Sequence, residues 1–336
     1  MVIGDLRAPT IISTFAGCGG SSLGYRMAGY KELLAIEWDG KAVETFLLNF
    51  LEVPIWQKDI RLVSAEEILD FCGIEVGELD LLDGSPPCQG FSKAGRQCVS
   101  DSRNILFVEF ARLLRGLQPK VFVMENVDNI VRGRMKGVFK DIMLALKDCG
   151  YVVKCRLMNT EWYGVPQRRR RLIWVGARND LNVNPSYPIP QSLSITVRDA
   201  LRGLLIQSQF KALSERKQKL YHATKRGDDL SGAALKILGK KNNSFTYRRL
   251  AWDKPSPTIC ASSGGILHPD ECRLLTIAEL KRLSSFPDWF QFIGSFSRQW
   301  LLIGNSVPPL FMRAIAEHIR KNILDFAGKR VVKVDG

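Results

Sequence analysis

The segment TIISTFAGCGGSSLGYRMAG, residues 10–29, places a glycine-rich turn between a β-branched apolar stretch and a stretch with helical character. Glycines at such a junction let a ligand approach the backbone at the N-terminus of the following helix. A dinucleotide fingerprint requires G-x-G-x-x-G, but counting from Gly17 and Gly19 the third position is Ser22. The segment therefore indicates a ligand site at a strand–helix turn and weakens a nicotinamide interpretation.

Strand-like and helix-like segments alternate over the first 180 residues. The expected strands cover 10–17, 33–38, 79–82, 120–126, 151–159 and 171–178, with helical patterns after residue 20 and over 41–50, 104–116 and 136–148. This alternation predicts an α/β fold with a doubly wound, mostly parallel sheet. We expect a first domain over residues 1–180 and a smaller one over 181–295, which is richer in Pro, Ser, Lys and Arg. Residues 296–336, with a helical pattern over 310–326, are expected to return to the first domain.

The composition indicates a cytoplasmic protein without a zinc site or a disulfide framework. No apolar run reaches the roughly 18 to 20 residues that a membrane span requires. The N-terminus lacks the pattern of a secretory signal. The eight cysteines include no C-x-x-C pair, and there are only three histidines. We expect a monomer with no metal.

The charge is unevenly placed along the chain. Lys and Arg number 48 against 34 Asp and Glu, which gives a net charge of +14. Residues 201–250 hold 12 basic and three acidic residues. The run RRRR at 168–171, earlier in the chain, is a second basic cluster. A solvated basic face is the alternative, but a clustered excess favours a nucleic-acid partner.

Two further segments carry candidate chemistry. In GSPPCQGFS, residues 84–92, two prolines shape a loop directly after a buried strand, and Cys88 follows them. This loop is either a structural turn with an incidental thiol or the site of a nucleophile. Glu37 ends the second strand, and in nucleotide sites of this topology an acidic residue at that position binds the ribose hydroxyls. Asp59 could accept a hydrogen bond from an adenine amino group. Together with the glycine turn, these carboxylates indicate a cofactor that contains adenosine.

Six blocks occur here in the order seen in cytosine-C5 methyltransferases, and the chain resembles that family over nearly its whole length. The blocks are FAGCGG (15–20), EWD (37–39), the cysteine loop, ENV (125–127), QRRRR (167–171) and GNSVPP (304–309). Residues 101–107 and 275–288 also resemble family segments. The chain departs from the family at Ser284 and Ser285, where a Gln-Gly pair is usual before Phe-Pro-Asp.

The resemblance implies a class I, Rossmann-like methyltransferase that uses S-adenosyl-L-methionine. Cys88 would add to carbon 6 of cytosine, because a thiolate is both a good nucleophile and a good leaving group. Glu125 would stabilise the negative charge that then develops at N3 of the ring, through a hydrogen bond or a proton. Arg169 and Arg171 would project from one face of a strand to hold the ring and the cysteine loop. The implied cofactor contacts are Phe15, Gly17, Gly19, Gly20, Glu37, Trp38, Asp59, Ile60, Pro87, Leu106, Asn305 and Val307.

The substrate implied by the resemblance is a cytosine flipped out of double-stranded DNA, recognised by the second domain. Candidate DNA contacts are Gln89, Ser92, Lys240, Lys241, Asn242, Asn243, Arg248 and Arg249. A companion restriction endonuclease acting on the same site is a further possible partner. Three alternatives stay open at this point: a tRNA cytosine-C5 methyltransferase, an inactive DNA-binding protein of the same fold, and an oxidoreductase.

Overall fold

The computed structural model of the chain describes residues 7–87, 106–131, 136–191, 193–204, 210, 212–239, 247–261 and 265–325. The chain divides into two compact units. The first contains residues 1–158, 170–189 and 312–336, and the second contains 159–169 and 190–311. The expected boundaries at 180 and 295 differ from these: residues 159–169 belong to the second unit, and the return to the first unit comes at residue 312.

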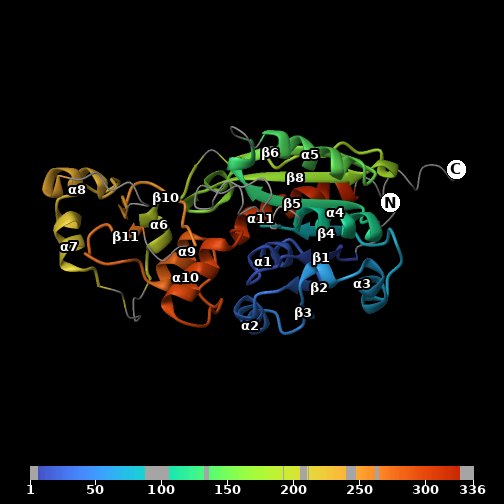
Figure 1. Cartoon of the computed structure of the whole chain (residues 1–336), viewed down its shortest axis with the longest axis horizontal. Coiled ribbons are helices and arrows are strands. Elements are labelled where there is room, and N and C mark those ends of the chain that lie inside the picture. The colour runs from blue at the N-terminus through green and yellow to red at the C-terminus, as the bar shows by residue number, and fades with distance from the viewer. Residues whose placement is uncertain are drawn as a thin grey trace. The chain divides into compact units, whose positions relative to one another are not determined.

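The first unit contains a seven-stranded sheet in the order β3-β2-β1-β4-β5-β8-β6 (Figure 1). The strands are β1 (Thr10–Thr14), β2 (Lys31–Glu37), β3 (Ile55–Gln57), β4 (Leu81–Gly84), β5 (Val121–Val127), β6 (Tyr151–Asn159) and β8 (Arg170–Arg178). Strands β3, β2, β1, β4 and β5 pair in parallel, and β8 pairs with β5 antiparallel. The predicted α/β class with a mostly parallel sheet is confirmed.

Helices cover both faces of this sheet. They are α1 (Gly20–Met27), α2 (Gly40–Asn49), α3 (Ala65–Cys72), α4 (Leu106–Leu117), α5 (Lys136–Lys147) and α11 (Pro309–Ile319), which begins in the second unit. One core joins α3, α4 and α5 to sheet residues that include Leu82. The next residue, Asp83, projects to the opposite face, where it meets Tyr25 of α1. Helix α3 was not expected from the sequence, although Ser64 accepts a hydrogen bond from the Glu67 amide as its N-cap.

The second unit is built from short elements around its own apolar core. Its strands β7 (Gln167–Arg168) and β10 (Ser256–Pro257) pair in parallel, as do β9 (Arg248–Arg249) and β11 (Ile266–Leu267). Its helices are α6 (Val197–Leu201), α7 (Glu215–His222), α8 (Ser231–Leu238), α9 (Ile277–Leu283) and α10 (Phe296–Asn305). Among the described residues of the chain, no helix is both long enough and apolar enough to cross a membrane.

Two acidic side chains lie beneath α1 at the sheet. The Tyr25 hydroxyl donates to Asp83 Oδ1 at 3.0 Å, and the Ser22 hydroxyl donates to Glu32 Oε1 at 2.9 Å. Burial raises the pKa of Asp83 to about 8 and the pKa of Glu32 to about 7. Both carboxyl groups are therefore largely protonated in the folded protein at mildly acidic pH.

These raised pKa values predict how the stability depends on pH. The folded state binds protons more tightly than the unfolded chain, so the free energy of unfolding should fall as pH rises from about 4 to about 8. Asp83→Asn keeps an acceptor for Tyr25 and removes the titration, so the fall should become smaller, with Glu32 and Glu37, whose pKa values burial also raises, contributing to what remains. Urea unfolding across this pH range measures the effect.

Asp70→Asn, at an exposed position of α3, is the matched control and should leave the pH dependence unchanged. An Asp83→Asn variant with the wild-type pH dependence would show that Asp83 does not hold its proton in the folded state.

Candidate active site

The glycine turn folds back onto the carboxylate that ends β2. The Gly17 amide donates to Glu37 Oε2 at 2.8 Å, and the amides of Trp38 and Asp39 donate to Oε1 at 2.9 Å each. Burial raises the pKa of Glu37, while these three donors oppose the shift. A carboxylate offers about four lone-pair positions, so about one acceptor position remains on Glu37, at Oε2. One more hydroxyl group could be bound there without breaking an existing bond.

The surroundings of this carboxylate fit an adenosine-bearing cofactor. Gly17 has φ +57°, and a Cβ built there would meet nothing within 4 Å, so the backbone of the turn is open to a ligand. Phe15 adopts φ 54°, a left-handed conformation that is strained for a non-glycine residue and typical of functional sites. Trp38, directly after Glu37, is 74% exposed and presents an aromatic face for stacking. Gly19 is different, because a Cβ there would lie 2.3 Å from the Phe50 ring, so its role is close packing.

The other predicted cofactor contacts lie at the ends of neighbouring elements. Both Asp59 oxygens accept from Arg61, which lowers the pKa of Asp59, so an adenine amino group would share an acceptor that is already in use. Ile60 is buried in the turn that follows, whereas Leu106 and Pro87 are partly exposed. Gly20 is buried at the first position of α1.

Asn126 connects β5 to the segment that precedes Cys88. Its Nδ2 donates to the Pro86 carbonyl at 3.0 Å, and its Oδ1 accepts from the Val127 amide at 2.8 Å. No role was expected for Asn126 from the sequence, although its position in the ENV block, next to a predicted catalytic residue, was a signal. Cys88, Gln89 and Ser92 lie outside the described residues.

Glu125 and Arg171 lie together on one face of the β5–β8 ladder. Arg171 pairs with Val127, and two residues along the strand Glu125 projects to the same face. The Arg171 Nε atom is 2.6 Å from Glu125 Oε1, and the Glu125 residue is only 8% exposed. This ion pair brings together two of the four residues to which the resemblance assigned catalysis.

Arg169 does not share a strand with Arg171. The run 167–171 is divided between β7 and β8, and Arg169 lies between them, at the end of a segment of the second unit. Its buried guanidinium donates through Nη1 to the carbonyls of Ile259 at 3.1 Å and Gly304 at 2.9 Å. The expectation that Arg169 and Arg171 project from one face of a strand assumed that side chains alternate along one continuous strand. It therefore does not describe how these two arginines are arranged.

The GNSVPP block connects α10 to α11 in the second unit. Asn305 is exposed at the end of α10, and Val307 is buried. Gly304 is required for packing, because a Cβ there would lie 2.6 Å from the backbone of Cys260 and Ala261. Trp300 donates from its indole to the Cys260 carbonyl and fixes the same contact.

The two arginines of β9 have different surroundings. Arg249 donates to the carbonyls of Pro269 at 2.7 Å and Thr224 at 2.9 Å, and it stacks over the Tyr221 ring. Arg248 is exposed, with Asp229 at 3.9 Å. Arg249 therefore holds the second unit together, and Arg248 is the arginine available to a ligand. Lys240, Lys241, Asn242 and Asn243 lie outside the described residues.

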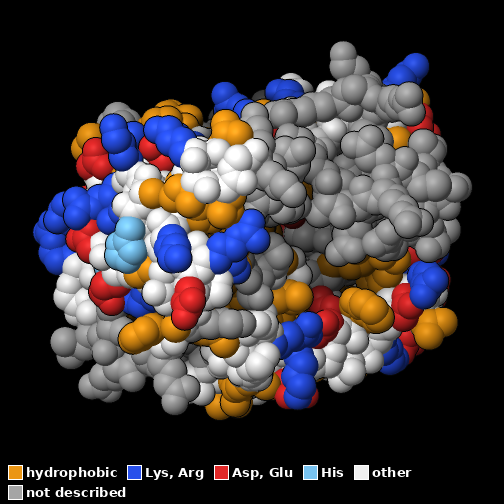
Figure 2. Space-filling model, turned by 60° about the vertical axis from the view of Figure 1, so that its left-hand side comes forward, with side chains coloured by type: hydrophobic (Ala, Val, Ile, Leu, Met, Phe, Trp, Pro, Cys, Tyr) orange, Lys and Arg blue, Asp and Glu red, His pale blue; other side chains and the backbone are white. Residues whose placement is uncertain are grey.

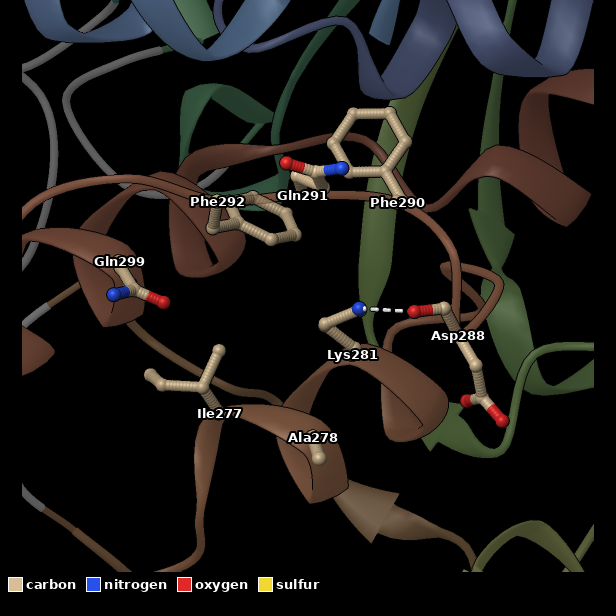
Figure 3. Close-up of a pocket in the computed structure, with 8 residues that line it drawn as sticks. All are labelled: Ile277, Ala278, Lys281, Asp288, Phe290, Gln291, Phe292 and Gln299. Atoms are coloured by element: carbon tan, nitrogen blue, oxygen red, sulfur yellow. Dashed lines mark hydrogen bonds between the residues drawn. The ribbon is translucent and has the colours of Figure 1, made fainter. Parts of the chain in front are cut away.

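Charged side chains of both signs lie on one face of the molecule (Figure 2), and a pocket lies in the second unit. Basic side chains are interleaved with acidic and apolar ones on the face drawn in Figure 2. In the second unit a pocket of about 330 Å³ lies at α9 (Figure 3). Lys281 borders it and donates to the Asp288 carbonyl at 2.7 Å. None of the site residues predicted from the sequence lines this pocket.

Comparisons with known proteins identify the family of the chain. The family model of the C-5 cytosine-specific DNA methylases matches residues 9–321. The chain is 33% identical over 326 residues to the Type II methyltransferase M1.HphI of Haemophilus parahaemolyticus, across 93% of this chain and 87% of that protein. It is 34% identical over 344 residues to the Type II methyltransferase M.Eco47II of Escherichia coli, across 96% and 81%.

Solved structures extend the likeness to the fold. A candidate DNA modification methyltransferase encoded within an Escherichia coli prophage superposes with a TM-score of 0.79 and 26% identity, across 95% of this chain and 100% of that one. A mutant DNMT2 of Spodoptera frugiperda, 17% identical, superposes with a TM-score of 0.67 across 94% and 100%, which is a likeness in fold alone.

The fold and the site define a class I methyltransferase, whose fold is that of S-adenosylmethionine-dependent enzymes. Within that class, the chain belongs to the family of C-5 cytosine-specific DNA methylases. It is accordingly a DNA (cytosine-5-)-methyltransferase. The oxidoreductase interpretation is wrong, and among the interpretations of this fold the DNA methyltransferase is the one that the family supports.

The Asn126 contact leads to a test of loop positioning. Asn126→Asp removes the donor to the Pro86 carbonyl and places a negative charge beside it, so the segment before Cys88 should shift. A misplacement of about 1 Å can cost about 100-fold in rate, and we expect the single-turnover methyl-transfer rate to fall by about 10- to 100-fold.

The control is Asn129→Asp, a partly exposed residue in the turn just after β5. An Asn126→Asp variant with the wild-type rate would contradict the positioning role.

Proposed function

We propose that Cys88 attacks carbon 6 of a cytosine flipped out of duplex DNA, with Glu125 and Arg171 beside the base. The observation that carries this proposal is the Glu125–Arg171 pair at 2.6 Å, directly next to Asn126, which holds the chain two residues before Cys88. An acid and an orienting guanidinium therefore lie at the end of the strand beside the one from which the cysteine loop departs. Arg169, which donates to the Gly304 carbonyl, is the fourth residue of the proposed catalytic set.

The chemistry requires this combination of groups. Addition of the Cys88 thiolate to carbon 6 places negative charge on the ring at N3, which Glu125 stabilises through a hydrogen bond or a proton, while Arg171 holds the carboxyl group in place. Carbon 5 then becomes nucleophilic. S-adenosylmethionine, when bound, would supply an electrophilic methyl group to carbon 5 and would leave as S-adenosylhomocysteine. Loss of the carbon 5 proton to a base and departure of the thiolate from carbon 6 regenerate the aromatic ring and the free cysteine.

The cofactor would be held at the carboxyl ends of β1, β2 and β4. Glu37 has about one free acceptor position for a ribose hydroxyl, and Trp38 offers a face to the adenine. Phe15, Gly17, Gly19 and Gly20 form or support the turn beside the methionine part. Asp59, Ile60, Pro87, Leu106, Asn305 and Val307 complete the proposed set.

The second unit would recognise the DNA. We assign the catalytic role and most of the cofactor binding to the first unit, and target recognition to the second unit, in place of the expected segments 1–180, 181–295 and 296–336. Phosphate contacts by basic side chains supply most of the affinity in such complexes. The Type II names of the relatives favour a restriction–modification system with a companion endonuclease.

Bisulfite sequencing tests the proposed function and the nucleophile together. Plasmid DNA from cells that express the chain should carry protected cytosines in one short sequence context, and Cys88→Ser should abolish the protection. Immunoblotting confirms that both proteins are present in soluble form.

Protection that persists in Cys88→Ser would contradict covalent catalysis by this residue. Unprotected DNA from cells with soluble wild-type protein would contradict the DNA substrate, and methyl transfer into tRNA would then identify the alternative.

The two arginines of β9 allow DNA contact to be separated from stability. Arg248→Gln should weaken DNA binding and reduce the slope of log K against log salt by about 1, because one phosphate contact is lost. Arg249→Gln should instead lower the melting temperature, because the carbonyls of Thr224 and Pro269 lose their donor. Salt titrations of DNA binding and thermal unfolding measure the two effects, and identical behaviour of the variants would contradict this division.

A further inference from the structure

The departure at Ser284 and Ser285 lies at the C-terminal end of α9. Phe286 donates its amide to the Lys281 carbonyl at 2.9 Å, and Ser285 donates to the Arg282 carbonyl at 3.0 Å. These two bonds form a Schellman motif, in which the residue after the C-cap adopts a left-handed conformation. Ser285 is that residue, with φ 61°. The glycine that the family usually has there adopts this conformation without strain, whereas serine does not.

The serine hydroxyl makes a bond that glycine cannot make. Ser285 Oγ accepts from the Leu310 amide at 3.2 Å. Leu310 is the second residue of α11, and an amide in the first turn of a helix has no acceptor within the helix. The residue before this helix is Pro308, which has no side-chain acceptor, so the usual N-cap bond is missing. Ser285 supplies that acceptor from another element.

The neighbouring serine extends the connection to the arginine run. Ser284 is buried, and its Oγ accepts from Gln167 Nε2 at 3.2 Å. Gln167 Oε1 accepts in turn from the Ile259 amide, while Arg169 binds the carbonyls of Ile259 and Gly304. Both ends of the segment 304–310 are therefore held within the second unit, by Arg169 at Gly304 and by Ser285 at Leu310.

The turn that carries the two serines is itself fixed. Lys281 donates to the Asp288 carbonyl at 2.7 Å (Figure 3), and the Arg282 guanidinium pairs with the Asp288 carboxylate. Ser285 is therefore a rigid point of attachment for the start of α11.

We propose that Ser285 is a positioning residue for the segment 304–309, and that cofactor affinity depends on its hydroxyl bond to Leu310. This inference rests on the proposed function, in which Asn305 and Val307 contact S-adenosylmethionine. Loss of the bond releases one end of the segment, so its contacts with the cofactor become less well ordered. Glu125 and Arg171, which are proposed to act on the cytosine, keep their ion pair.

Two substitutions separate the hydroxyl from the backbone conformation. Ser285→Ala removes the hydroxyl and keeps the left-handed strain, whereas Ser285→Gly removes both. In the full chain, both variants should raise the KM for S-adenosylmethionine by about five- to tenfold, with kcat within about twofold of wild type. Their melting temperatures should differ in direction: Ser285→Ala should melt a few degrees lower, and Ser285→Gly should melt at or above the wild-type temperature.

Ser297→Ala, at an exposed position of α10, is the control and should leave both kinetic constants unchanged. Wild-type KM in Ser285→Gly would overturn the inference, because the backbone conformation alone would then suffice. A loss in kcat at unchanged KM would also overturn it, because Ser285 would then act on the base site. Wild-type protein that neither binds S-adenosylmethionine nor transfers methyl groups would instead refute the proposed function itself.

Discussion

The parallel pairing of β1 with β2 on one side and β4 on the other determines where chemistry can assemble in this chain. The three strands end at the same edge of the sheet, and the strand order reverses between β1 and β4, which is where α/β sheets bind ligands. The glycine turn leaves from β1 and the proline loop from β4. Close packing enforces this arrangement, because a Cβ at Gly84 would lie 2.6 Å from Phe110 and Thr14.

Side chains that bind backbone groups organise the edge further. Glu37 accepts three amides and so fixes the glycine turn, and Asn126 holds the Pro86 carbonyl. In the second unit, Arg169 does the same at Gly304. Each of these hydrogen bonds joins a side chain of one motif to the backbone of another segment. The motifs therefore stabilise one another's conformation in addition to their proposed ligand contacts.

The sequence predicted every strand of the sheet except the three-residue β3, and it predicted the positions of Glu37 and Glu125, because apolar periodicity and strand ends are local properties. It could not show that Arg249 is held by Pro269 and Thr224, since those partners come from distant segments. The same holds for Tyr25, which meets an acid 58 residues away. The sequence also did not show that Arg169 and Arg171 lie in different elements, because the alternation of side chains was applied to one unbroken strand.

The central claim is that Cys88 forms the bond to the target base, and trapping the adduct tests it most directly. Duplex DNA synthesised with 5-fluorocytosine retains fluorine at carbon 5, so no proton can be removed there and the thiolate cannot leave after methyl transfer. Incubation with S-adenosylmethionine should give a denaturant-resistant complex, and mass spectrometry should place the modified base on the peptide that contains Cys88. A complex attached elsewhere, or no complex under conditions in which ordinary DNA is methylated, would contradict the account.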